Sequence, residues 1–281
     1  MFPAPRQKAT PPKQYLYYAA VIVALLEWLL PLLAVLLTSI RSAEDLNMGN
    51  YWGWPKEWKF SNYIEIFQAT PLTRYLINTV VITLPAVFCA IALATLGGYA
   101  LAKFKFRGNL LMFCIFVGGN FVPFQILMVP VRNMTLRFGL LDTYWALILF
   151  HLAFQTGFCT LFMRNFISTL PNALIESARV EGVNELKIFW YIIVPLLRPA
   201  LAALAVLLFT FVWNDYFWAL VLVQSDTVKP ITTGIASLRG QWLASWQLIS
   251  AGSIVAALPP VAMFFLLQRQ FIAGLTLGAV K

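Results

Sequence analysis

Long apolar runs constrain this chain more than any other feature of its sequence. The run from Tyr17 to Ile40 contains one ionisable residue, Glu27, and is long enough to cross the hydrocarbon core of a bilayer as a helix. Hydrophobic residues make up 60% of the sequence and charged residues 11%, whereas the apolar share of a water-soluble domain of this size would be under a half. The sequence therefore predicts an all-α integral membrane protein.

Six such runs predict six transmembrane helices. The third is expected to be kinked by Pro123 and Pro130 and to lie inside the helix bundle, where neighbours satisfy its free carbonyls. The first lacks a signal-peptide cleavage site, so it is expected to remain in the protein. Residues 1–16 are predicted to be a flexible basic tail and residues 269–281 a second tail. The spans are expected at about 17–40, 75–102, 110–131, 143–166, 201–223 and 250–267.

Few side chains within the spans suggest chemistry. Glu27 is expected to face other helices or water, and packing is favoured over a transport role. His151, the single histidine, is expected to be a packed hydrogen-bonding residue and not a ligand or proton relay. Cys89, Cys114 and Cys159 all fall in apolar runs, which indicates neither a disulfide framework nor a metal site.

The distribution of charge predicts the topology. The two tails and two of the loops, with Arg164 counted at a loop edge, contain twelve Lys and Arg against three acidic residues; the other three loops contain eight against six. Cytoplasmic segments of membrane proteins carry an excess of Lys and Arg. Both termini are therefore predicted to be cytoplasmic, in a multi-pass membrane protein; the family resemblance described below implies the bacterial inner (plasma) membrane. The net charge of +9 follows from this topology, and no nucleic-acid partner is expected.

Residues 171–199, which we call the charged hairpin, interrupt the apolar pattern. Seven charged residues occur between Arg164 and Arg198. Asn172 is predicted to cap a helix that begins at the next residue, and Gly182 to end it in a left-handed conformation. Asn184 then caps a second helix, with Glu185 in its first turn, until Pro195 disrupts it. The pattern favours a helix, a glycine turn and a second helix on the cytoplasmic side. Such a hairpin is either a docking element for a soluble partner or an ordinary solvated loop.

A spaced motif lies within this hairpin. Glu176-Ser177-Ala178 is followed after two residues by Glu181-Gly182 and, nine residues later, by Ile192-Ile193-Val194-Pro195. This resembles the EAA loop of ATP-binding-cassette (ABC) importer permeases, which reads Glu-Ala-Ala, two residues, Asp-Gly, nine residues, Ile, any residue, Leu-Pro. The spacing matches at every anchor. Ser177, Glu181 and Val194 depart from the pattern but keep size or charge roughly constant.

From about Asn62 onward, the chain resembles the second membrane subunit of carbohydrate-uptake, maltose-type importers. The blocks that carry the resemblance are Asn78-Thr79, Gly98 to Ala102 with the basic loop Lys103 to Gly108, the prolines of the third span, the charged hairpin, Trp213-Asn214-Asp215, and the closing Gly274-Leu275-Thr276 and Gly278 to Lys281.

The resemblance implies a MetI-like fold and a complex of several chains. That complex would contain a second, different permease, two nucleotide-binding ATPase subunits that bind ATP and Mg²⁺, and an extracytoplasmic solute-binding protein. The substrate would be a mono- or oligosaccharide. The residues implied to couple this chain to the ATPase are Glu176, Ser177, Ala178, Glu181, Gly182, Ile192 and Pro195, with tail contacts from Gly274, Leu275 and Thr276.

Two regions have both a functional and a structural interpretation. Asn214, Asp215, Tyr216 and Trp218 offer the hydrogen-bonding groups and aromatic faces of a sugar pathway, although helix packing uses the same residues. In the long polar stretch 41–74, Tyr51, Trp52, Trp54 and Trp58 either anchor the chain at the membrane interface or contact a solute-binding protein.

Catalysis by this chain is not expected. The sequence contains no G-x-x-x-x-G-K-[ST] loop, no H-E-x-x-H and no G-x-S-x-G. A docking hairpin without its own ATPase site implies that ATP is hydrolysed by another chain. The alternative from a different class is a self-contained secondary transporter or polytopic membrane enzyme.

Overall fold

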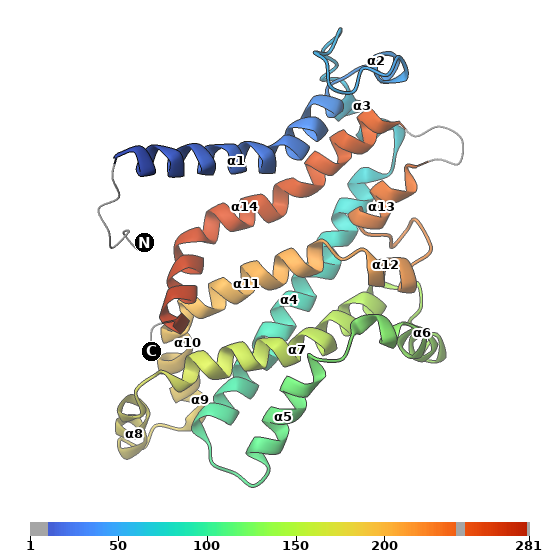
Figure 1. Cartoon of the computed structure of the whole chain (residues 1–281). Helices are drawn as coiled ribbons and strands as arrows, with labels where there is room; N and C mark the ends of the chain where they lie inside the picture. Colours follow the sequence, from blue (N-terminus) through green and yellow to red (C-terminus); the bar gives the residue numbers. More distant parts are fainter. Residues whose placement is uncertain (1–10, 240–244, 280–281) are drawn as a thin grey trace. The chain divides into compact units, whose positions relative to one another are not determined.

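The computed structural model describes residues 11–239 and 245–279, and its regular structure is helical (Figure 1). The chain divides into two compact units. The first comprises Met1–Thr70 and Leu238–Val255, and the second comprises Pro71–Ser237 and Ala256–Lys281. The helix α14 (Trp246–Ala279) contributes to both.

The first unit contains α1 (Pro11–Ser39), α2 (Ala43–Asn47), α3 (Asn62–Ala69) and the start of α14. Residues 11–16 are already helical, so the expectation of a flexible tail is wrong for them; residues 1–10 lie outside the described part. Glu27 is exposed on α1, so its predicted packing against other helices does not occur within this chain. The buried apolar residues of this unit include Ile40, Leu46 and Ile66, which follow α1, and Leu248, Ile249 and Ala251 of α14.

The second unit is a bundle whose centre is formed by α4, α7 and α11. Its remaining helices are short or bent. Besides the end of α14, the helices of this unit are α4 (Leu72–Lys103), α5 (Asn109–Gly119), η1 (Phe124–Leu127), α6 (Met128–Arg137), α7 (Tyr144–Ser168), α8 (Asn172–Val180), α9 (Glu185–Ile188), η2 (Phe189–Ile193), α10 (Val194–Leu196), α11 (Arg198–Trp213), α12 (Phe217–Leu222) and α13 (Ile231–Ser237).

Small side chains allow α4 and α7 to pack closely. Ala90 and Ala94 of α4 are fully buried, as are Cys159 and Met163 of α7. A Cβ added at Gly98 would lie 2.9 Å from the backbone nitrogen of Arg164, which is closer than side chains can approach. Gly98 is therefore required by packing, as is common where membrane helices touch.

The fold class predicted from sequence is confirmed: the chain is an all-helical membrane protein. Four helices are long and apolar enough to span a bilayer, within Gln14–Ser39, Leu72–Lys103, Tyr144–Ser168 and Trp246–Ile272. Two bent pairs bring the number to six if each pair counts as one span. The last helix continues well past the predicted end at residue 267, with Pro259 and Pro260 inside it.

The two bent spans differ from expectation. In the third, α5 ends at Gly119 and the chain turns by 90° before the segment from Phe124, so the break falls near Pro123, while Pro130 is accommodated inside α6. Within the described part of this chain α5 has no buried residue, so the prediction that this span lies inside the bundle is wrong for the isolated subunit. The fifth span bends by 73° near Leu197, before the predicted helix 201–223 begins, and that helix is interrupted again between Trp213 and Phe217.

Candidate functional site

The charged hairpin has the turn that its sequence predicts. Gly182 adopts a left-handed conformation with φ of 76° and ends α8. Asn184 caps α9, because its side-chain oxygen accepts a hydrogen bond from the Lys187 amide at 2.8 Å. The capping role predicted for Asn172 is wrong: Pro171 occupies the cap position, and Asn172 Oδ1 accepts from Lys103 Nζ at 2.8 Å. The second helix becomes a π-helical turn at Phe189, before Pro195 is reached.

The motif residues are distributed over both faces of α8. Glu176, Ser177 and Glu181 are exposed, whereas Ala178 is buried next to Ile175. Further along the hairpin, Ile192 is half-buried and Pro195 exposed. The carboxylates of the motif are thus available to a partner, while its alanine is covered by the chain itself.

Large apolar side chains also project from the hairpin. Val180 is 89% exposed, Tyr191 79% and Leu186 67%. These residues flank the glycine turn and the exposed motif carboxylates on a segment that its charge places outside the bilayer. Exposed apolar side chains beside charged ones are a feature that protein interaction sites share.

An ion pair joins the two helices of the charged hairpin. Arg179 Nε donates to Glu185 Oε1 at 2.5 Å, which joins the end of α8 to the start of α9 across the turn. This hydrogen bond raises the pKa of Arg179, so the guanidinium stays charged. The same guanidinium lies over the ring of Phe104, 5.5 Å from its centre.

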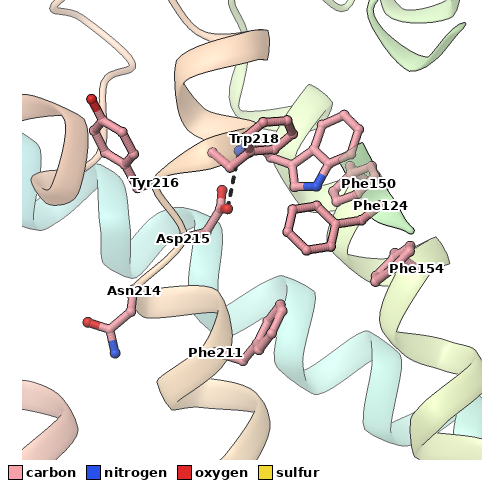
Figure 2. Close-up of a pocket in the computed structure, with 9 residues that line it drawn as sticks. Phe124, Phe150, Phe154, Phe211, Asn214, Asp215, Tyr216 and Trp218 are labelled. Atoms are coloured by element: carbon pink, nitrogen blue, oxygen red, sulfur yellow. Dashed lines mark hydrogen bonds between the residues drawn. The ribbon is translucent and has the colours of Figure 1, made fainter. Parts of the chain in front are cut away.

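A cavity of about 270 Å³ opens where the fifth span is interrupted (Figure 2). Asn214, Asp215, Tyr216 and Trp218 all line it, so the four residues predicted for a sugar pathway do meet at one place. In Figure 2 Asn214 and Tyr216 point away from the aromatic rings, while Asp215 points toward Trp218. The remaining lining residues are Phe124, Phe150, Phe154, Phe211 and Phe217.

Asp215 explains the interruption of the helix. Its carboxylate accepts hydrogen bonds from the backbone amides of Trp218 at 3.2 Å and Ala219 at 3.1 Å, and so caps α12. His151 Nε2 lies 3.4 Å from the same carboxylate. His151 is buried, and its Nδ1 has no hydrogen-bond partner among the described residues. The histidine is therefore packed, as predicted, and positions the capping carboxylate.

The phenylalanines of this cavity were not predicted from sequence. Phe150 and Phe154 stack with ring centres 5.6 Å apart, and Phe124 meets the edge of Phe217 at 5.4 Å. Phenylalanine occurs in five of the six predicted spans, so its type alone does not indicate a site. Phe150 and Phe154 are one helical turn apart and close to His151 in the chain. Only this spacing could have indicated the cavity from the sequence.

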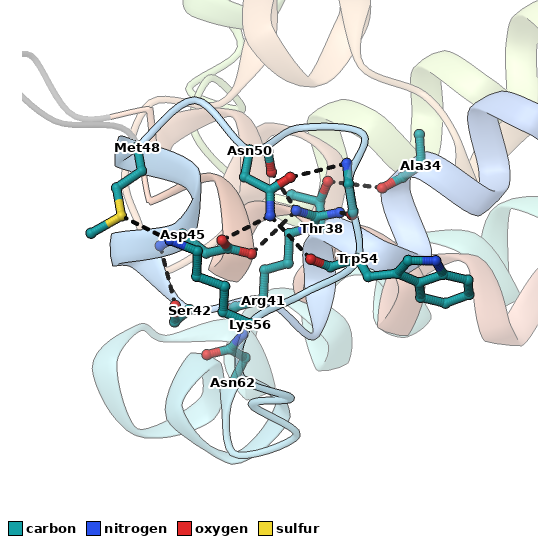
Figure 3. A network of polar contacts seen from close by, with 11 residues as sticks. Ala34, Thr38, Arg41, Ser42, Asp45, Met48, Asn50, Trp54, Lys56 and Asn62 are labelled. Atoms are coloured by element: carbon teal, nitrogen blue, oxygen red, sulfur yellow. Dashed lines mark hydrogen bonds and ion pairs between the residues drawn. The ribbon is translucent and has the colours of Figure 1, made fainter.

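The aromatic stretch after α1 belongs to a well-built loop (Figure 3). Arg41 is fully buried, pairs with Asp45 at 3.2 Å and donates to the carbonyls of Asn50 and Gly53. The Asn50 side chain donates to Asp45 at 2.9 Å, and this hydrogen bond holds the pKa of Asp45 below its usual value. The loop is thereby ordered around a buried cation.

The aromatic residues themselves lie on the surface of this loop. Trp54 and Trp58 have ring centres 6.4 Å apart, and Trp58 stacks on Phe60. Tyr51 and Trp52 are also exposed. The structure thus presents them as a patch on an ordered support.

The predicted tail contacts are only partly described. The backbone of Gly274, Leu275 and Thr276 is helical as part of α14, and their side chains lie outside the described part of the chain. Among the described residues, no three His, Cys, Asp or Glu side chains gather in a way that could hold a metal ion.

Residues 86–276 match the family described as "Binding-protein-dependent transport system inner membrane component". The match covers well over half of the chain and includes α7, the charged hairpin and the aromatic cavity. The chain belongs to this family: it is a multi-pass inner-membrane permease subunit of a binding-protein-dependent ABC importer, as predicted from the motif in the hairpin.

Curated relatives align over nearly the whole chain. It is 34% identical over 271 residues to an osmoprotective compounds uptake permease, GgtD, of Synechocystis sp., covering 94% of this chain and 91% of the relative. It is 32% identical over 263 residues to the melibiose/raffinose/stachyose import permease MelC of Bacillus subtilis, covering 93% and 94%.

One solved structure has the same fold. A chain of a bacterial ABC transporter involved in the import of the acidic polysaccharide alginate superposes with a TM-score of 0.80, at 23% identity, covering 95% of this chain and 100% of that one.

Proposed function

We propose that this permease imports an uncharged oligosaccharide or a related polyol glycoside, and that it forms one half of the pathway. The printed names of its relatives include uptake permeases for osmoprotective compounds and for melibiose, raffinose and stachyose. The cavity at the break of the fifth span combines aromatic rings with Asn214, Asp215 and Tyr216. Aromatic faces and hydrogen-bonding side chains are the groups that bind sugar rings.

The lining of this cavity supports an uncharged substrate. Asp215 is the one charged residue among its described lining residues, and its carboxylate already caps α12 and faces His151. A sugar acid would therefore meet a negative charge and no cation there. The chain is thus suited to a different substrate from the alginate of the transporter that shares its fold.

The partners in this proposal are a second, different permease, two ATPase subunits that bind ATP and Mg²⁺, and an external solute-binding protein. The observation that carries the docking assignment is the exposure of Val180, Leu186 and Tyr191 on the hairpin that carries the exposed motif carboxylates. The aromatic patch around Trp54 is a candidate contact for the solute-binding protein, because an ordered loop presents it.

Val180→Lys tests the docking assignment. Because Val180 is 89% exposed, a lysine there leaves the bundle intact but places a charge in a desolvated interface. The co-purifying ATPase subunits and ATP-driven uptake should both fall by about tenfold or more.

Phe106→Lys is the matched control, since Phe106 is an exposed apolar residue of the neighbouring basic loop. It should leave both quantities unchanged. Normal ATPase retention and uptake in Val180→Lys, at normal expression, would contradict the assignment.

A further inference from the structure

The helix α4 has polar ties to other segments at both of its ends. At one end, Tyr99 Oη donates to Glu185 Oε2 at 2.9 Å. Lys103 Nζ donates to the Leu170 carbonyl at 2.7 Å and to Asn172 Oδ1 at 2.8 Å. The Lys103 contacts fix the start of α8. Its end is fixed through Glu185, which accepts from Tyr99 and also pairs with Arg179. Both ends of α8 are thus attached to the final turns of α4.

At the opposite end, α4 is attached to residues 224–230, which we call the outer loop. Asn78 Nδ2 donates to the carbonyls of Thr227 at 3.1 Å and Lys229 at 2.9 Å. Tyr75 Oη donates to Asp226 at 3.1 Å. Just beyond the loop, the Ile231 amide donates to Thr79 Oγ1 at 2.8 Å.

Further contacts hold the outer loop in place. The Asp142 carboxylate accepts from the amides of Gln224 at 2.8 Å and Ser225 at 2.9 Å. Lys229 and Tyr75 both donate to Asp226 and hold its pKa below the usual value, so this carboxylate is charged at neutral pH. The loop therefore follows the ends of α4 and α7 and is not free to move alone.

The segment of α4 between the two sets of ties is a continuous helix. From Asn78 to Tyr99 the rise is about 32 Å, roughly the thickness of the hydrocarbon core. Pro85 lies within it, but the helix is unbroken from Leu72 to Lys103. Ala90, Ala94 and Gly98 pack it closely on α7, which opposes bending.

The covalent connections of the hairpin contain bends. Its exit into α11 passes through a π-helical turn and a 73° change of direction near Leu197. Its entry from α7 passes through the non-helical residue Pro171. These bends can absorb a displacement of α8 along either route, whereas the hydrogen bonds to α4 lead directly into an unbroken helix.

We propose that α4 transmits the movement of the charged hairpin to the outer loop, with Tyr99 and Lys103 as positioning residues at the near end and Asn78 at the far end. The inference rests on the proposed function, since the ATPase must move the hairpin. Its consequence is that the state of the ATPase changes the outer loop, the surface that faces the arriving solute.

Tyr99→Phe and Lys103→Gln test the near end. Each removes hydrogen bonds to the hairpin and leaves the exposed docking surface unaltered. The chain offers matched controls in Tyr18→Phe, on the exposed surface of α1, and Lys105→Gln, in the exposed basic loop. The readout is the ATPase activity of the reconstituted complex with the loaded solute-binding protein, divided by the activity without it.

We expect this stimulation ratio to fall by about tenfold in Tyr99→Phe, the effect of losing one hydrogen bond to a charged group, and to be unchanged in both controls. Basal ATPase activity and subunit retention should be unchanged in all four variants. A second variant at the far end, Asn78→Ala, should lower the same ratio. The double variant should be little worse than either single one, because a helix detached at one end transmits nothing.

A reporter on the outer loop measures the transmission directly. Gln224→Cys places a thiol on an exposed side chain, in a background without Cys89, Cys114 and Cys159. Its labelling rate should change when ATP is added to the wild-type complex, and the change should disappear in Tyr99→Phe. A wild-type stimulation ratio and a nucleotide-dependent labelling rate in Tyr99→Phe would overturn the inference. Loss of ATPase subunits from the unaltered complex would instead refute the proposed function.

Discussion

Gly182 is the residue whose backbone conformation shapes the docking turn. Its φ of 76° is unfavourable for any side chain, although no described atom lies within 4 Å of a Cβ built there. Gly182→Ala therefore acts through strain alone, at a cost of about 1–2 kcal/mol. We expect a lower Tm of the purified subunit and a several-fold loss of ATP-driven uptake.

Gly139→Ala is the control for this substitution. Gly139 has a φ of 66° and equally open surroundings, but it lies in the loop before α7, away from the hairpin. It should lower Tm by a similar amount and leave the ATPase stimulation ratio unchanged. Equal losses of that ratio in the two variants would show that strain and not docking is responsible.

Asp215 is the residue on which the aromatic cavity depends. Asp215→Ala removes the cap of α12, at a cost of about 1 kcal/mol, and removes the carboxylate that lies 3.4 Å from His151 Nε2. Uptake should fall severalfold, with retention of the ATPase subunits unchanged. Asp215→Asn retains one acceptor oxygen for the cap and should preserve most of the uptake. If Asn is as harmful as Ala, the charge and not the cap is required.

At the scale of elements, one break in the third span and one in the fifth are explained by residues at the break itself. The helix α11 ends at Trp213 because the Asp215 carboxylate accepts a hydrogen bond from the Trp218 amide and so starts a new helix, α12. The third turns near Pro123, which lacks an amide donor. Polar residues and proline create both breaks, and together the breaks place Phe124 and Phe217 in one cavity.

The last helix gives a prediction of its own. The family resemblance implies that Gly274, Leu275 and Thr276 contact the ATPase, and α14 continues as a helix through them to Ala279. Deleting Gly274 to Lys281 should weaken retention of the ATPase subunits in detergent pull-downs while the two permeases stay paired. A truncated complex that keeps its ATPase subunits and imports at the full rate would show that this terminus has no docking role.

At the scale of the whole molecule, the exposed surfaces indicate an incomplete assembly. Residues 14–33 of α1 are all exposed, and α5 has no buried side chain within the described chain. Lipid covers such surfaces in a bilayer, and a second permease would cover others. The prediction that the third span is interior is therefore wrong for this subunit by itself, and α5 would become interior only where another chain covers it.

The sequence by itself determined the membrane class, the positions of most spans, the glycine turn and the family. These follow from apolar run length, from the conformational freedom of Gly182 and from the spacing of Glu176, Glu181 and Pro195, all of which are local properties. It also placed Asn214, Asp215, Tyr216 and Trp218 together, since they are neighbours in the chain.

Only the tertiary structure decided which distant residues complete each site. His151 lies beside Asp215, and the phenylalanines of α7 line one cavity with Trp218. Asn172 accepts a hydrogen bond from Lys103 instead of capping α8. Each of these contacts joins residues far apart in sequence, and its free energy depends on how helices pack and not on local preference. The ties at both ends of α4 are of the same kind, which is why no motif in the sequence indicated them.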